Sequence, residues 1–114
     1  MKVSFEGIGQ WCATFMGGVT EGHVVKVDSG GCVAGCAAGD PFCGVAVCAR
    51  EDACTVQMGG FAAVGYSGAA PALGYTALTA DGKGGVQSAG EAEGGVSRWV
   101  VDRDESGKTV TILL

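Results

Sequence analysis

The sequence has few charged residues, few prolines and a single histidine. Charged side chains make up 17% of the 114 residues, and there are 2 prolines. The 7 basic residues are scattered singly among 12 acidic ones, which gives a formal net charge of −5. Proteins bind nucleic acids through clustered basic side chains that neutralise the backbone phosphates, and this chain has no such cluster. We therefore expect no nucleic-acid partner.

Long apolar runs are also missing from the sequence. A helix that spans a bilayer needs about 20 consecutive apolar residues, and no stretch of the chain approaches that length. Residues 1–7 lack the continuous apolar segment of an export signal. The sequence therefore predicts no membrane partner, and we expect the protein to be made and kept in the cytosol.

Glycine, in contrast, is abundant. The chain has 22 glycines without a Gly-X-Y period, and 47% of its residues are hydrophobic. Each interior glycine costs a helix about 1 kcal/mol relative to alanine, so valines separated by glycines favour strands and turns. Turn signals recur about every 8 to 12 residues, as in small barrels and sandwiches. We predict an all-β fold, a small single-domain β-barrel or sandwich of short antiparallel strands.

The N-terminal part of the chain differs from the rest in its pattern. We expect residues 1–21 to form an N-terminal arm and a first strand, and residues 22–114 to form the β-barrel core. The first ten residues alternate like an edge strand but contain two glycines, so a loose arm is equally compatible with them. Beyond them, a strand would bury Trp11, Ala13 and Phe15 together.

The central stretch of the sequence, residues 40–66, has the pattern of a β-hairpin. Its first half, residues 42–49, is a run of small apolar and β-branched residues, which is typical of a strand buried on both faces. A four-residue charged turn follows. We expect a charged residue in place of Val45 or Val47 to abolish folding.

The second half of this hairpin alternates between apolar and polar residues. Thr55 and Gln57 are predicted to face water, while the residues between them face the core. The pair Gly59 and Gly60 predicts a bulge or bend at which the strand changes direction. Further strands are expected at residues 23–28, 32–37, 72–79, 86–88, 96–102 and 109–114.

Six cysteines and one histidine are the candidate metal ligands. Structural zinc sites usually present cysteine pairs two to four residues apart, and Cys32 and Cys36 approach that spacing, with Cys43, Cys48 and His23 as remote ligands. Cys43 and Cys48 lie an odd number of residues apart on one predicted strand, so without a bulge they point to opposite faces. A free cysteine packs as a small hydrophobic residue, and we favour buried thiols without a metal or other cofactor. A small zinc- or thiol-based β module that uses these five residues is the alternative.

The sequence offers no arrangement of residues for catalysis. A cysteine nucleophile needs a base, and His23 is the single histidine that could serve. The acidic pairs Glu51–Asp52 and Asp104–Glu105 fall in predicted turns, where carboxylates are ordinary turn formers. We therefore predict a non-enzymatic protein without catalytic residues.

Large apolar side chains on the arm and on two strands are candidates for a subunit contact. The simplest interpretation of the aromatic residues is that they lie in the core or in an interface, and on a small barrel they can also form a subunit contact. They are Trp11, Phe61, Tyr66, Tyr75 and Trp99. The candidate interface residues are Phe5, Ile8, Trp11 and Trp99.

Six segments, taken in order along the chain, also share a common pattern of turn glycines and short strands. They are residues 22–27, 39–46, 55–60, 73–78, 81–86 and 100–114. Their succession resembles that of the small β-barrel head-decoration (capsid-stabilising) proteins of tailed phages and prophages.

This resemblance implies a structural protein without an active site. Such proteins commonly form homotrimers that sit on the lattice of the major capsid protein and hold the expanded shell against internal pressure. The resemblance implies a place in the bacterial cytoplasm during assembly and on the virion head surface afterwards. An apolar contact between copies and a capsid-facing edge would then carry the function. Residues 1–10 are a candidate for strand addition to a capsid subunit.

Overall fold

A computed structural model describes residues 10–90 and 95–114 of the chain. These residues form ten strands and no helix, which confirms the predicted all-β fold. Within these two ranges, therefore, no helix is long and apolar enough to span a membrane. The predicted N-terminal arm, with the interface candidates Phe5 and Ile8, lies outside the described residues.

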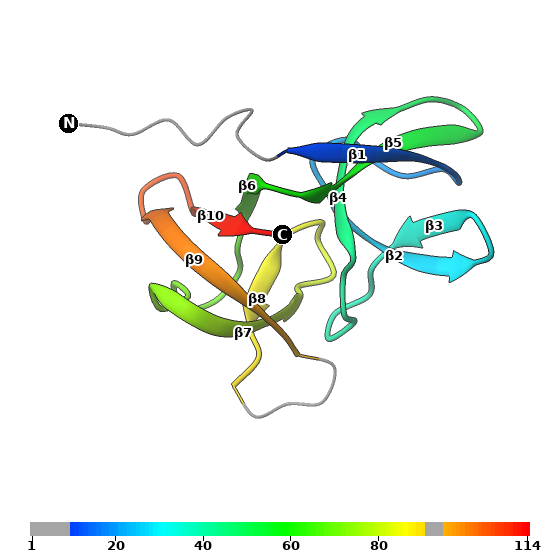
Figure 1. Cartoon of the computed structure of the whole chain (residues 1–114). Helices are drawn as coiled ribbons and strands as arrows, with labels where there is room; N and C mark the ends of the chain where they lie inside the picture. The colour runs from blue at the N-terminus through cyan, green and yellow to red at the C-terminus, as the bar shows by residue number, and fades with distance from the viewer. Residues whose placement is uncertain (1–9, 91–94) are drawn as a thin grey trace.

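The first half of the described chain forms a small closed barrel, and the second half forms a five-stranded sheet beside it (Figure 1). The barrel order is β1-β3-β2-β4-β5 and the sheet order is β6-β10-β9-β7-β8. The barrel strands are β1 (Trp11–Met16), β2 (Val24–Ser29), β3 (Cys32–Gly35), β4 (Gly44–Ala49) and β5 (Ala53–Gly59). The sheet strands are β6 (Phe61–Gly65), β7 (Gly74–Ala80), β8 (Val86–Ser88), β9 (Val96–Asp104) and β10 (Thr109–Leu113).

Most strand pairs are antiparallel, as predicted, but the contact between β1 and β3 that closes the barrel is parallel. β1 runs antiparallel to β5 along its whole length, from Trp11 opposite Gly59 to Met16 opposite Ala53. Its other contact is a single parallel pair with β3, between Met16 and Cys32. The barrel is therefore closed by one residue pair at the end of β1.

Two hydrophobic cores lie on opposite sides of the barrel wall. The interior core contains Val25 and Ala46, whereas their chain neighbours Val24 and Val45 pack into a second core shared with the sheet. Adjacent residues of a strand point to opposite faces, so β2 and β4 are buried on both faces where these pairs lie. This confirms the predicted burial for the first half of β4.

The chain passes from the barrel to the sheet at Gly60, which confirms the bend predicted there. Gly60 has a φ of +81°, a left-handed conformation that glycine adopts without strain. The side chain of Gln57 brackets this residue, because its Nε2 donates to the carbonyl oxygens of Gly59 at 3.0 Å and of Phe61 at 2.8 Å. Its Oε1 accepts a hydrogen bond of 2.8 Å from Nε2 of Gln10.

The burial of Gln57 corrects one sequence prediction. Gln57 lies opposite Val45 in the register of β4 and β5, so its side chain projects on the side of the barrel that the sheet covers. It is 3% exposed, although the alternation of β5 predicted that it would face water. The face predicted to be solvated is thus occupied by the second half of the molecule.

Two apolar residues expected in the core lie at the surface. Val47 is the extra residue of a bulge, because Ala46 pairs with Val56 and Cys48 with Thr55. The bulge turns Val47 outward, where it is 42% exposed. Trp11 is also exposed, and its indole ring lies over Gly59 instead of entering the barrel with Phe15.

The predicted turn before β8 is fixed by Asp81. Its Oδ1 accepts hydrogen bonds from the backbone nitrogens of Lys83 at 2.7 Å and Gly85 at 3.0 Å, and its Oδ2 accepts one of 2.7 Å from Ser67 Oγ. Burial raises the pKa of the Asp81 carboxyl, but these hydrogen bonds to the charged form outweigh burial and hold the pKa below its usual value. One ionised side chain thus ties the turn to the loop after β6.

The two valines of β4 offer a direct test of this packing. Val45→Asp places a carboxylate in the shared core, where Val45 is 4% exposed, and should lower the free energy of unfolding by about 4 kcal/mol or more. Val47→Asp is the matched control and should change the free energy of unfolding by less than about 0.5 kcal/mol. Urea titration followed by circular dichroism measures both. Equal destabilisation by the two variants would contradict the observed packing.

Candidate functional site

The cysteines named as candidate ligands are spread over the barrel. Cys32 lies at the start of β3 and is half-buried, and Cys36 follows the same strand. Cys43, also half-buried, packs against the interior core, whereas Cys36 packs against the core shared with the sheet. Cys48 is exposed on β4, which corrects the expectation of a buried thiol at that position.

The contacts described for His23 are with residues other than these cysteines. Its ring lies against Gly84, close enough that a side chain at residue 84 would collide with it. Its backbone is held by hydrogen bonds with Thr20 and Ala46. Within residues 10–90 and 95–114, no three His, Cys, Asp or Glu side chains lie close enough together to hold a metal ion.

The chemistry around Cys36 is that of a protonated thiol. Burial is the largest cause that raises its pKa, to about 11, and the neighbouring Asp40 carboxylate raises it further. Lys26 opposes this effect, but its ammonium group pairs with Asp40 at 2.7 Å. Hydrogen bonding in that pair holds the pKa of Asp40 below and that of Lys26 above the usual values. Burial also raises the pKa of Cys43 and Cys54.

Cys48 lies at the rim of a pocket on the wall of the barrel. The pocket has a volume of about 260 Å³ and lies where β1, β4 and β5 run side by side. Its lining consists of Thr14, Cys48, Arg50, Ala53, Cys54 and Thr55. The two threonines and Cys48 are cross-strand neighbours in the register, so polar groups form one side of it.

Thiol reactivity follows from these surroundings. In a brief pulse of iodoacetamide at pH 8, the exposed Cys12 and Cys48 should be modified first. Cys36 should react at least about 10-fold more slowly, because a two-unit rise in pKa reduces the thiolate about 100-fold. Peptide mapping by mass spectrometry gives the order. Modification of Cys36 as fast as that of Cys48 would contradict the described burial.

A row of large apolar side chains crosses the sheet. Leu113 of β10 lies between Phe61 of β6 and Trp99 of β9, and Trp99 lies opposite Tyr75 of β7. Residues directly opposite one another on paired strands project from the same face. We call these four residues the apolar stripe.

The apolar stripe lies on the outer face of the sheet. The chain neighbours Ala62, Ile112 and Val100 are buried in the shared core, so the stripe residues beside them point the other way. Tyr75 is 66% and Trp99 52% exposed, and their ring centroids are 5.3 Å apart. Phe61 and Leu113 are half-buried. The side chains therefore present a broad aromatic surface over four strands.

Small side chains flank the apolar stripe. Ala63 and Thr111 form the next cross-strand pair on one side, and Ala77 and Ser97 a pair on the other. Leu73, two residues before Tyr75, is exposed as well. Asp102, which lies opposite Thr111, adds an exposed carboxylate beside the stripe on the same face.

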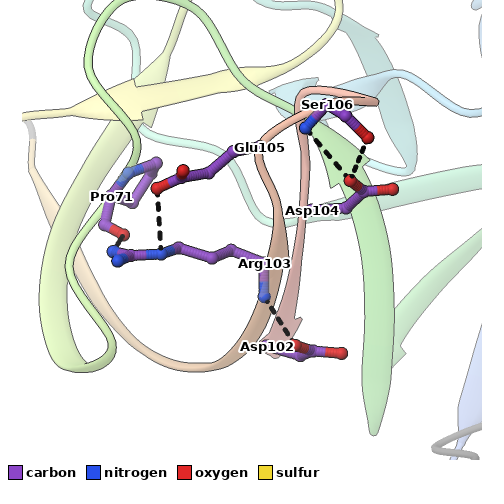
Figure 2. A network of polar contacts seen from close by, with 6 residues as sticks. All are labelled: Pro71, Asp102, Arg103, Asp104, Glu105 and Ser106. Carbon is purple, nitrogen blue, oxygen red and sulfur yellow. Dashed lines mark hydrogen bonds and ion pairs between the residues drawn. The ribbon is translucent and has the colours of Figure 1, made fainter. Parts of the chain in front are cut away.

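A charged network bounds the sheet at the β9–β10 turn (Figure 2). Figure 2 shows Arg103 reaching the loop before β7, where its Nη1 donates to the carbonyl oxygen of Pro71 at 3.1 Å. Arg103 Nε lies 3.6 Å from Glu105 Oε1. Asp104 Oδ1 accepts hydrogen bonds from the backbone nitrogen of Ser106 at 3.1 Å and from its Oγ at 2.9 Å. Exposed ion pairs of this kind add at most about 1 kcal/mol, so the network mainly defines a polar border.

The sequence identified one member of the stripe in advance. Trp99 was an interface candidate and lies at the centre of the row, whereas Trp11 lies on β1 over Gly59. The sequence did not predict that Phe61, Tyr75 and Leu113 would line up with Trp99. Their alternation with buried neighbours was visible in the sequence, but their alignment depends on strand order and register.

Comparison of the chain with protein-family models, with curated proteins and with solved structures finds no significant match.

Proposed function

We propose that this protein is a non-enzymatic structural protein, a phage or prophage head-decoration protein that oligomerises and stabilises a capsid lattice. The observation that carries the proposal is the apolar stripe, an aromatic surface on the outer face of a small all-β domain. Contiguous exposed apolar surface on a soluble domain marks a site of protein contact. Aromatic residues supply most of the energy in such contacts.

The shape of the outer face supports contact with a flat protein surface. Trp99 and Tyr75 are the most exposed side chains of the stripe, and the cross-strand pairs Ala63–Thr111 and Ala77–Ser97 beside it are small. Decoration needs little affinity per copy, because many copies bind a repeating lattice and copies that contact one another bind with a higher effective concentration. We assign the stripe to the contact between copies, in a homotrimer, and a remaining edge of the molecule to the major capsid protein.

The proposal places the protein in the bacterial cytoplasm during assembly and on the head surface of the virion afterwards. The resemblance in the order of strands and turn glycines, from residue 22 to the C-terminus, supports this placement. The observed strands follow that order, with β2, β4, β5 and β7 to β10 at the matching segments. The net charge of −5 is compatible with a partner that carries basic groups on its outer surface.

Two measurements on purified protein test the proposed function. Analytical ultracentrifugation should show a trimer for the wild-type chain and at least 10-fold weaker association for Trp99→Ser, because an aromatic residue at the centre of a contact contributes about 2 kcal/mol or more. Val27→Ser, which removes an equally exposed apolar residue from β2, is the matched control and should leave association unchanged.

Co-sedimentation with expanded shells then tests whether the protein binds the capsid lattice. The shells are assembled from the major capsid protein encoded in the same genome, and the wild-type chain should saturate them at a fixed ratio of copies. Failure to bind such shells at micromolar concentration would contradict the proposed function, as would a genome without a capsid gene. If the protein were a monomer and still bound shells, the apolar stripe would not be the contact between copies.

A further inference from the structure

The pocket on the barrel wall is separate from the apolar stripe, because all the residues that line it belong to the first half of the chain. An apolar cavity of about 150 Å³ holds benzene, so a pocket of about 260 Å³ has room for a small organic ligand. Thr55 of β5 lies directly opposite Thr14 of β1 on one side and Cys48 of β4 on the other. These three side chains therefore project from the same face of the wall.

The two threonine hydroxyls at this face have no protein partner. Within residues 10–90 and 95–114, neither Thr14 Oγ1 nor Thr55 Oγ1 takes part in a hydrogen bond with another protein group. A hydroxyl group carries one donor hydrogen, which rotates to suit its acceptor. Both hydroxyls are therefore available to donate to a ligand in the pocket.

Arg50 supplies a positive charge to the same pocket. Its backbone nitrogen donates to the carbonyl oxygen of Ala53 at 2.8 Å, which fixes the turn between β4 and β5. Its guanidinium makes no hydrogen bond or ion pair with any residue that the structure describes. The fork of N–H donors on a guanidinium matches the oxygens of a carboxylate or phosphate. The pocket thus combines a free cation with two free hydroxyl donors.

None of the described residues that line the pocket carries a carboxylate. Glu21 Oε1 accepts a hydrogen bond of 3.0 Å from the backbone nitrogen of Ala49. Successive backbone N–H groups of a strand point to opposite edges, and that of Arg50 points toward β5, so Glu21 lies at the other edge of β4. The turn residues Glu51 and Asp52 are exposed and form no part of the lining. The charge that faces the pocket is therefore positive, although the chain as a whole carries −5.

We propose that this pocket binds a small oxyanion, the carboxylate or phosphate group of a low-molecular-weight ligand. The guanidinium of Arg50 is its charge partner, and the hydroxyls of Thr14 and Thr55 donate to its oxygens. The site lies on the barrel, whereas the stripe lies on the sheet, so this inference does not depend on the proposed function. The exposed thiol of Cys48 at the rim reports on the charge of the site.

Alkylation by two reagents of different charge tests the site. Iodoacetate carries a carboxylate, and iodoacetamide is its neutral counterpart. Peptide mapping by mass spectrometry gives the rate at Cys48 relative to Cys12, which is also exposed but does not line the pocket. This ratio of rates should be at least about 3-fold higher with iodoacetate than with iodoacetamide, because a nearby positive charge attracts the anionic reagent. Equal ratios for the two reagents would overturn the proposal.

Two variants assign this effect to its source. Arg50→Gln should remove the preference of Cys48 for iodoacetate. Lys83→Gln is the matched control, since it removes an exposed positive charge that does not line the pocket, and it should keep the preference. A preference that survives Arg50→Gln would overturn the assignment of the anion to this pocket.

Competition then tests binding of the oxyanion itself. Sodium phosphate or sodium acetate at about 20 mM, compared with sodium chloride of equal ionic strength, should slow the reaction of iodoacetate at Cys48 at least about 2-fold and leave Cys12 unchanged. Protection by phosphate or by acetate supports the proposal and identifies the group that the pocket holds. Protection by neither anion, or equal slowing of Cys48 and Cys12, would overturn it.

Discussion

The side-chain amide of Gln57 holds the junction between the two halves of the molecule. Its two N–H groups bind the carbonyl oxygens on either side of Gly60, and its oxygen is bound by Gln10. A buried polar group that lost these partners would cost about 1–3 kcal/mol, so the amide strongly favours this path of the chain. The left-handed φ of Gly60 turns the chain here, and β6 leaves the barrel to begin the sheet.

This junction decides which surfaces of the sheet are available. Because β6 starts beside the barrel wall, the inner face of the sheet closes on Val24 and Val45 and forms the shared core. The outer face then carries the apolar stripe, with Trp99 and Tyr75 exposed. The same bond network anchors Gln10 at the end of the stripe. Fold, exposed surface and the proposed contact thus depend on a single polar cluster.

The sequence predicted the local structure well and the contacts between distant segments poorly. Alternation and turn glycines located the strands and the bend at residue 60, because these are properties of neighbouring residues. Gln57 was predicted to be exposed, since a polar residue in an alternating strand normally faces water and only the sheet, formed later in the chain, covers it. Val47 was predicted to be buried because nothing in the sequence indicates the bulge. The bulge shifts the register at a position that has neither a glycine nor a proline. Trp99 was named as an interface candidate from the sequence alone, whereas the row that contains it depends on the pairing of four strands.

The free energy of unfolding of Gln57→Leu tests the role of this junction most directly. Leucine keeps most of the volume of the side chain and removes both donors, so the hydrogen bonds from residue 57 to the carbonyl oxygens of Gly59 and Phe61 are lost. The account predicts a loss of about 2–4 kcal/mol in urea unfolding, against less than about 1 kcal/mol for Gln10→Ala, which removes the exposed member of the cluster. A Gln57→Leu domain within about 0.5 kcal/mol of the wild-type stability would contradict it.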